Sequence, residues 1–246
     1  PSSTNKRNDN NTNFSSNNPP QHPSDPSFTR GYCWWLLKEA KKRNANIETY
    51  ALAESWPRWV ANGTAAPAGA LDVPELAAEY IVTWVRGAKD VHNLTIDWVG
   101  LWNEHFEATD VMVQYSKELR RQLDAQGLQG TRIIAPDAFS SSAEVLANEI
   151  LKDPVLQQAV DAIGIHGAIP VNTDDTTTCT SAVCRTGLPR FVSEDGSTYG
   201  DAAGALLRVQ QCHTEHLASA AGNNLLPFGL SQGSNFWNPF GAYYPA

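Results

Sequence analysis

The chain lacks three features that would each point to a particular class of protein. It has no run of roughly 18 apolar residues, which argues against a membrane-spanning helix. It has no excess of basic charge, and its net charge of −8 argues against a nucleic-acid-binding footprint. No internal repeats are visible. It begins at Pro1 without a basic-then-apolar leader, so we expect either that a leader was removed or that the chain is a piece of a longer protein.

Cysteines are few, and two of the four lie close together in a threonine-rich loop. Cys179 and Cys184 form either a small disulfide loop of a secreted protein or two unpaired thiols, and we favour the disulfide. No His/Cys cluster completes a metal site, so we expect neither a metal nor a cofactor. Asn-x-Ser/Thr sequons, which favour a secretory route, begin at Asn10, Asn13, Asn62 and Asn93.

Aliphatic residues are nearly absent from residues 1–27, which are rich in Asn, Ser and Pro. Such a segment cannot bury enough apolar surface to offset the entropy of ordering it. We therefore predict a disordered segment over 1–27 and one folded domain over 28–246. The hydrophobic content of 41% is enough for a core.

Strand-like and helix-like segments alternate along the domain. This alternation is typical of an α/β protein with a parallel sheet. The predicted strands are Ile47–Leu52, 95–104, Thr131–Ala135, Ala162–His166, a run within 190–197 and Ser234–Trp237. The predicted helices are Arg30–Asn44, with Trp34 to Leu37 on its apolar side, Asp72–Lys89, with a capping box from Asp72 to Glu75, Val111–Gln126, Ala143–Val160, with a break at Pro154, and Ala203–Ala220.

Two of the predicted strands end in a glutamate. Glu104 follows Trp102-Asn103, Glu194 follows Val192-Ser193, and two more strands lie between them. In a (β/α)8 barrel the chemistry sits at the C-terminal strand ends, where two facing carboxylates suit glycoside hydrolysis. One would protonate the leaving oxygen and the other would attack the anomeric carbon. The alternative for Glu104 is a solvated residue that caps the next helix.

From Arg30 to about Tyr244 the sequence resembles glycoside hydrolase family 59, the galactocerebrosidase (galactosylceramidase) family. The resemblance consists of short sequence motifs that occur in the same order over some two hundred residues. Among them are Arg30-Gly31-Tyr32, Trp34-Trp35-Leu36, Thr83-Trp84-Val85, Trp102-Asn103-Glu104, Ile133-Ile134-Ala135, Ser193-Glu194-Asp195, Ser197-Thr198 and Trp237-Asn238.

The resemblance implies a (β/α)8 TIM barrel, of which this chain would hold about strands 3 to 8 and lack the first two. It implies that Glu104, after the fourth strand, is the acid/base and that Glu194, after the seventh, is the nucleophile. It further implies a retaining β-galactosidase that acts on galactosylceramide-like glycolipids in a lysosomal or secreted setting. A lipid-presenting saposin-like protein is an expected partner.

Several other residues are candidate substrate contacts. Asn103 is placed to bind the sugar 2-hydroxyl or to orient Glu194, with a helix cap as the alternative. His166 ends a strand and lines the pocket or is a satisfied buried histidine, whereas for Asp137 we favour a loop or cap role. The remaining candidates are Trp56 and Trp59 in an aromatic loop, Ser197, and Trp237, for which core packing is the alternative.

Two departures from the family pattern leave other functions open. Glu54 stands where the family has a tryptophan that contacts the sugar, although Trp56 could substitute for that ring. A related β-glycosidase with another substrate is therefore an alternative. Missing strands would leave open parallel edges, which invite aggregation. We accordingly expect the isolated 246-residue chain to be poorly soluble and inactive, and a truncated non-catalytic fragment is the third interpretation.

Overall fold

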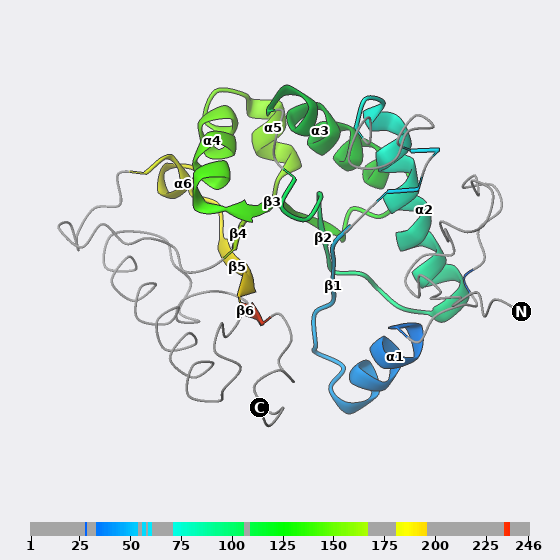
Figure 1. Cartoon of the computed structure of the whole chain (residues 1–246). Helices are drawn as coiled ribbons and strands as arrows, with labels where there is room; N and C mark the ends of the chain where they lie inside the picture. The colour runs from blue at the N-terminus through cyan, green and yellow to red at the C-terminus, as the bar shows by residue number, and fades with distance from the viewer. Residues whose placement is uncertain are drawn as a thin grey trace, which may run out of the picture. The chain divides into compact units, whose positions relative to one another are not determined.

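The computed structural model describes residues 28, 33–53, 56–57, 59–60, 71–105, 109–166, 181–195 and 234–236. Figure 1 labels the helices and strands. The chain divides into two compact units. The N-terminal unit comprises residues 1–99 and 110–132, and the C-terminal unit comprises residues 100–109 and 133–246.

The N-terminal unit alternates helices with short strands. Its elements are α1 (Cys33–Arg43), β1 (Tyr50–Ala51), α2 (Pro74–His92), β2 (Trp98–Gly100) and α3 (Thr109–Ala125), with the last residue of β2 and the first of α3 belonging to the other unit. β1 pairs with β2 in parallel, Tyr50 opposite Trp98 and Ala51 opposite Val99. Both predicted strands are therefore confirmed, although both are shorter than expected.

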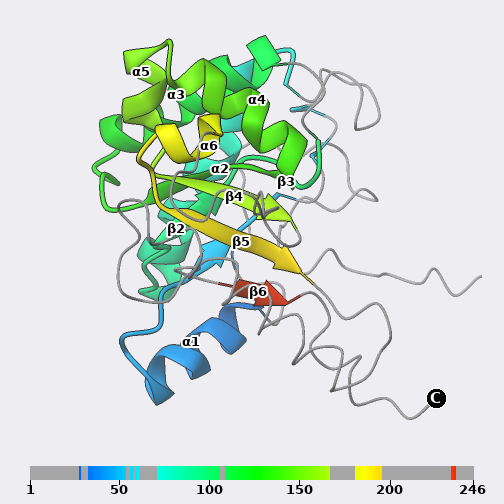
Figure 2. The ribbon, with the colours of Figure 1, turned by 90° about the vertical axis from the view of Figure 1, so that its left-hand side faces the viewer.

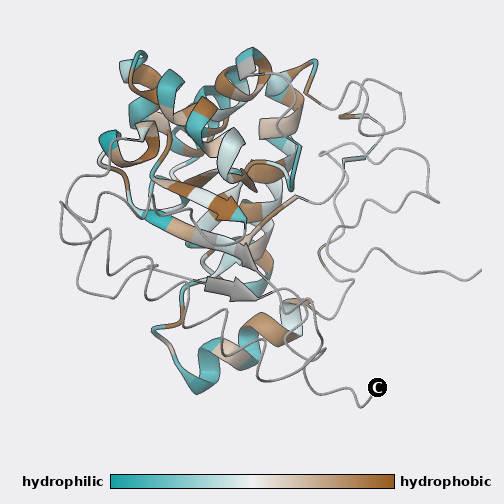
Figure 3. Ribbon diagram, turned by 60° about the vertical axis from the view of Figure 1, so that its left-hand side comes forward, coloured by the Kyte–Doolittle hydropathy of each residue, from teal (hydrophilic) through white to brown (hydrophobic). Residues whose placement is uncertain are grey.

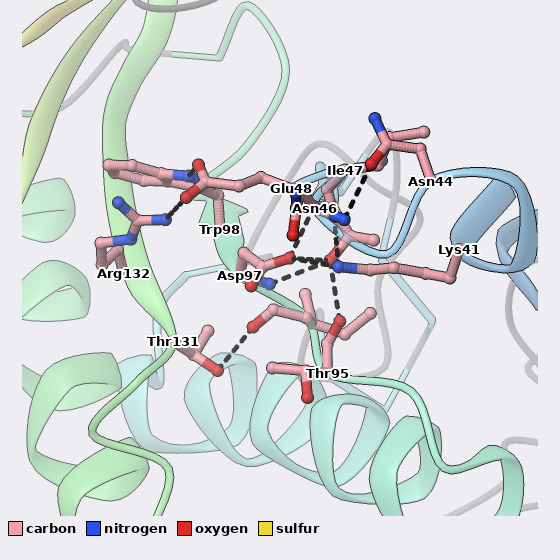
Figure 4. Close-up of polar contacts among 12 residues, drawn as sticks. Lys41, Asn44, Asn46, Ile47, Glu48, Thr95, Asp97, Trp98, Thr131 and Arg132 are labelled. Atoms are coloured by element: carbon pink, nitrogen blue, oxygen red, sulfur yellow. Dashed lines mark hydrogen bonds and ion pairs between the residues drawn. The ribbon is translucent and has the colours of Figure 1, made fainter.

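The half-buried carboxylate of Asp97 joins the chain before β1 to the chain before β2 (Figure 4). Asp97 Oδ2 accepts hydrogen bonds from the Thr49 backbone N at 2.7 Å and from Thr49 Oγ1 at 2.9 Å. Lys41 Nζ of α1 approaches the same oxygen at 3.4 Å and also donates to the Ile47 carbonyl. These bonds fix α1 and β1 against β2 and so set the strand register.

The prediction for the apolar face of α1 was partly wrong. Trp34 is buried and stacks on Trp84 and His92, with ring centroids 5.1 and 4.5 Å apart. Trp35 and Leu36, by contrast, are 63% and 51% exposed. Four consecutive residues span a full turn of a helix at 3.6 residues per turn, so they cannot share one face.

Helix α2 follows its predicted period but not its predicted cap. Most of the predicted core positions are buried, including Tyr80, Ile81 and Val85, and Pro74 occupies the first turn. The capping box from Asp72 to Glu75 is wrong, because the N-cap residue is Val73 and makes no side-chain cap bond. α3 ends just before Gly127, whose φ of 72° suits the predicted stop.

The described part of the C-terminal unit contains four parallel strands in chain order. Its elements are β3 (Arg132–Phe139, whose first residue belongs to the N-terminal unit), α4 (Ser140–Ile150), α5 (Pro154–Ala159), β4 (Ala162–His166), α6 (Ala182–Arg185), β5 (Arg190–Asp195) and β6 (Ser234–Phe236). β3 pairs with β4, β4 with β5, and β5 with β6. Figure 2 shows β4, β5 and β6 side by side and pointing the same way.

Helices cover these strands with their apolar faces. Leu146 and Ile150 of α4 and Leu156 of α5 are fully or almost fully buried, and in Figure 3 brown and teal segments alternate along the helices. Glu144 of α4 accepts a 2.7 Å hydrogen bond from the backbone N of Ala182 and so holds α6. The predicted helix break at Pro154 is confirmed, because α5 begins at that residue, with Asp153 as its N-cap.

All six predicted strands have a counterpart in the described residues, and every printed pairing is parallel. The structure thus confirms an α/β fold with parallel strands. β3 continues to Phe139, so the predicted end of this strand near Pro136 was wrong. The predicted disordered segment 1–27 and helix Ala203–Ala220 lie outside the described residues.

Candidate active site

Glu104 lies in a turn directly after β2, within the C-terminal unit. The chain reaches it through Leu101 and Trp102, both buried, and leaves its side chain 41% exposed. Its backbone adopts a left-handed conformation, φ 54°, and its N–H donates a 3.0 Å hydrogen bond to the carbonyl of Asp137 in β3. Non-glycine residues rarely adopt this conformation unless the surroundings impose it, and such residues cluster at functional sites.

His166 meets the Glu104 carboxyl group. It is the last residue of β4 and is 7% exposed, and its Nδ1 lies 3.1 Å from Glu104 Oε1. On its other side the exposed ring of Phe139, at the end of β3, approaches edge-on with centroids 6.5 Å apart. The predicted strand-end histidine is thus within hydrogen-bonding distance of the predicted acid/base.

Asp137, whose carbonyl accepts the Glu104 hydrogen bond, carries a buried carboxyl group. Asp137 is fully buried within β3 and has a left-handed φ of 60°, so the predicted loop or cap role was wrong. Gly164 of β4 makes room for it. A Cβ on Gly164 would lie 2.7 Å from Asp137 Oδ1 and 2.9 Å from Ser193 Oγ. A glycine inside a run of isoleucines was the sequence signal for this close approach.

Glu194 is on β5, the strand next to β4. Its Cα pairs in register with His166, at a point where the register shifts between Ile165 and His166. Paired residues on neighbouring strands lie about 5 Å apart. The residue that contacts Glu104 is therefore also the strand neighbour of Glu194. The Glu194 side chain lies outside the described residues, so its pairing with Glu104 stays a prediction.

The two predicted aromatic contacts belong to the N-terminal unit. Trp56 is 5% exposed and packs edge-on against Tyr80 and Tyr115, with both centroid distances 5.8 Å. Trp59 packs on Tyr80 at 5.9 Å. Both rings pack against core residues, and their predicted contact with a sugar stays a prediction.

The other predicted contacts are placed in part. Asn103 precedes Glu104 in the same turn and is half-buried. Ser197, Trp237 and Glu54 lie outside the described residues. Cys184 is disulfide-bonded, but Cys179 also lies outside them, so the predicted pairing stays a prediction. Within the described ranges no group of three or more His, Cys, Asp or Glu residues could hold a metal, and no helix there is long and apolar enough to span a bilayer.

The arrangement of these groups suits proton transfer at a strand end. A partly exposed carboxyl group, an imidazole and a second carboxylate-bearing residue come from three different strand ends, as expected of a barrel active site. The turn that carries Glu104 is held by a bond to β3, and the side chain is held by a contact from β4.

The parallel α/β fold superposes on solved structures of the (β/α)8 type. The endo-beta1,6-glucanase BT3312 superposes with a TM-score of 0.65 at 18% identity, covering 89% of this chain and 52% of that one. SrfJ from Salmonella typhimurium superposes with a TM-score of 0.64 at 14% sequence identity, covering 82% of this chain and 48% of that one. The sequence places the chain more narrowly, because residues 7–227 match Glycosyl hydrolase family 59. The chain belongs to that family.

Two similar relatives are named galactocerebrosidase. The galactocerebrosidase of Danio rerio is 39% identical over 219 residues, which cover 89% of this chain and 29% of that protein. The galactocerebrosidase of Mus musculus is 46% identical over 143 residues, which cover 58% of this chain and 19% of that protein. The chain thus spans less than a third of the length of these relatives.

Proposed function

We propose that this chain is part of the catalytic barrel of a retaining β-galactosidase, with Glu104 as acid/base and Glu194 as nucleophile. The observation that carries the proposal is the position of His166. Its ring contacts the Glu104 carboxyl group, and its Cα is paired with that of Glu194 on the next strand. Family membership supports the same assignment.

The proposed reaction has two steps. In the first, the Glu194 carboxylate attacks the anomeric carbon and the bond to the leaving oxygen breaks. That oxygen takes the proton of Glu104. In the second, Glu104 removes a proton from water, the water oxygen bonds to the anomeric carbon, and the bond to Glu194 breaks. Two inversions at one carbon give net retention, for which the carboxyl groups must be about 5–5.5 Å apart.

The proposed substrate is a galactosylceramide-like glycolipid, because the relatives are named galactocerebrosidases. Such a substrate lies in a membrane, and its galactosyl bond must leave that membrane to reach the catalytic residues. We therefore include a lipid-presenting saposin-like partner in the proposal, together with a lysosomal or secreted location. The six strands are proposed to be strands 3 to 8 of the barrel.

Hydrolysis of a fluorogenic β-galactoside by the protein made from its complete gene tests the proposal. We expect turnover with retained configuration and a loss of at least about 100-fold on Glu194→Gln, because the nucleophile is removed. Glu39→Gln is the control, since this residue makes surface ion pairs on α1 and should leave turnover unchanged. Unchanged turnover in Glu194→Gln would refute the assignment.

A second candidate is a β-glycosidase for another sugar. The observation behind it is Glu54, where the family has a tryptophan that contacts the sugar. A carboxylate offers hydrogen bonds where an aromatic ring offers stacking, and this difference would change sugar preference. Rates on a panel of glucosides, xylosides and galactosides separate the two candidates, because the leading proposal requires galactosides to react fastest.

A further inference from the structure

Glu104 is restrained at two points by different strands. Its backbone N–H is held by the Asp137 carbonyl of β3, and its carboxyl group is held by His166 of β4. The left-handed backbone at Glu104 fixes the direction in which the side chain leaves the turn. One carboxyl oxygen is committed to His166 at 3.1 Å.

His166 is itself firmly placed. Its side chain is only 4% exposed, whereas that of Glu104 is 41% exposed. The strand register shifts between Ile165 and His166, at the last residue of β4. Such irregularities are common next to active sites. The Phe139 ring contacts the imidazole edge-on. The imidazole is thus a rigid group that holds a more exposed one.

We propose that His166 is a positioning residue for Glu104 in the reaction, an inference that rests on the proposed function. In the first step the bond between the anomeric carbon and the leaving oxygen breaks, and that oxygen takes the Glu104 proton. The new carboxylate accepts a hydrogen bond from His166 Nδ1–H, and His166 gains and loses no proton. A hydrogen bond to the ionised form stabilises it, so proton donation becomes easier as it occurs.

Two other roles predict different kinetics. A histidine that binds the sugar directly would affect all galactosides alike, mainly through KM. A histidine that only fills space would affect stability. A histidine that acts through Glu104 would affect only reactions that need a proton. A dinitrophenyl galactoside needs almost no proton at its leaving oxygen, whereas a phenyl galactoside needs one.

The test compares two amide variants at position 166 in the protein made from its complete gene. In His166→Asn the amide N–H replaces ring Nδ1–H, and in His166→Gln it falls nearer the position of Nε2. kcat/KM is measured on both galactosides because it reports the first chemical step. Thermal melts of both variants check that they fold.

We expect His166→Gln to lose roughly 10- to 100-fold on phenyl galactoside, a part of the 10²- to 10⁴-fold effect of a general acid. On dinitrophenyl galactoside the loss should be small, and His166→Asn should recover most of the rate on phenyl galactoside. His92→Gln is the matched control, because this histidine packs on Trp34 in the N-terminal unit and should leave the ratio of the two rates unchanged.

The outcomes separate the inference from the function on which it rests. Equal losses on both substrates, or no loss in His166→Gln, would overturn the positioning role while leaving the galactosidase assignment intact. A folded His166→Asn variant that is as slow as His166→Gln on phenyl galactoside would also overturn it. If the wild-type protein hydrolyses neither galactoside, the proposed function fails first and the inference fails with it.

Discussion

At the scale of single residues, the site depends on two non-glycine residues in left-handed backbone conformations. Glu104 and Asp137 have φ values of 54° and 60°, and one hydrogen bond joins their backbones. The sequence predicted a carboxylate at the first position because Asn103-Glu104 closes an apolar strand. It could not predict either backbone conformation, because each depends on a contact between segments more than thirty residues apart.

A substitution of Gly164 tests how closely β4 must approach the neighbouring strands β3 and β5. We predict that Gly164→Ala destabilises the protein by about 1–3 kcal/mol, because the new methyl group would overpack a filled core. It would lie 2.5 Å from Ile134 Cγ2 and 2.7 Å from Asp137 Oδ1. Chemical denaturation measures the change. Gly130→Ala is the control, since an added Cβ there meets nothing within 4 Å. Equal effects of the two variants would contradict the packing.

Tyr115 gives a prediction about pH. Burial, with a smaller contribution from Tyr80, raises the pKa of Tyr115, and its hydroxyl meets no hydrogen-bond partner among the residues that the structure describes. The unfolded state therefore ionises first, at about pH 10. Stability is retained below that pH and is lost as the pH rises above it, by up to about 1.4 kcal/mol per pH unit.

Tyr115→Phe should remove this loss and leave stability near neutral pH unchanged or slightly higher, because no satisfied hydrogen bond is deleted. Denaturation curves of the wild type and the variant between neutral pH and pH above 10 provide the measurement. If the stability of both proteins fell equally as the pH rises, the buried hydroxyl of Tyr115 would not be the cause of the loss at high pH.

At the scale of elements, the spacing of apolar residues along the sequence predicted where strands and helices lie, but not always where they end. β3 was expected to stop near Pro136, yet it runs on to Phe139, because the strand shifts register at Asp137 and resumes pairing with β4. The capping box of α2 failed because the helix starts two residues later than predicted, at Pro74, whose fixed φ suits a first turn. Local sequence patterns do not predict these element ends, because the ends depend on tertiary contacts.

Asp97 is the junction between α1, β1 and β2. We predict that Asp97→Ala costs about 1–3 kcal/mol, because the part-buried backbone N–H of Thr49 would lose its acceptor. The unfolding free energy from urea titration measures it. Glu39→Ala, which removes only exposed ion pairs on α1, should change stability far less. A comparable loss in both variants would show that Asp97 is no more than a surface charge.

At the scale of the whole molecule, the described part of the site belongs to a single unit. Glu104, Asp137, His166 and the backbone of Glu194 all lie in the C-terminal unit, although Glu104 is reached from β2. The order of strands and the two strand-end glutamates followed from the sequence. Closure of a barrel did not, because it depends on pairing between the first and last strands, which no local pattern encodes.

Trapping the covalent intermediate tests the central claim most directly. The protein made from its complete gene is incubated with a dinitrophenyl deoxyfluorogalactoside, which forms the glycosyl-enzyme quickly and releases it slowly. Mass spectrometry of the peptides then locates the label. We predict one deoxyfluorogalactosyl group on Glu194 and a stalled enzyme. A label on any other residue, or turnover that continues without a label, would contradict the account.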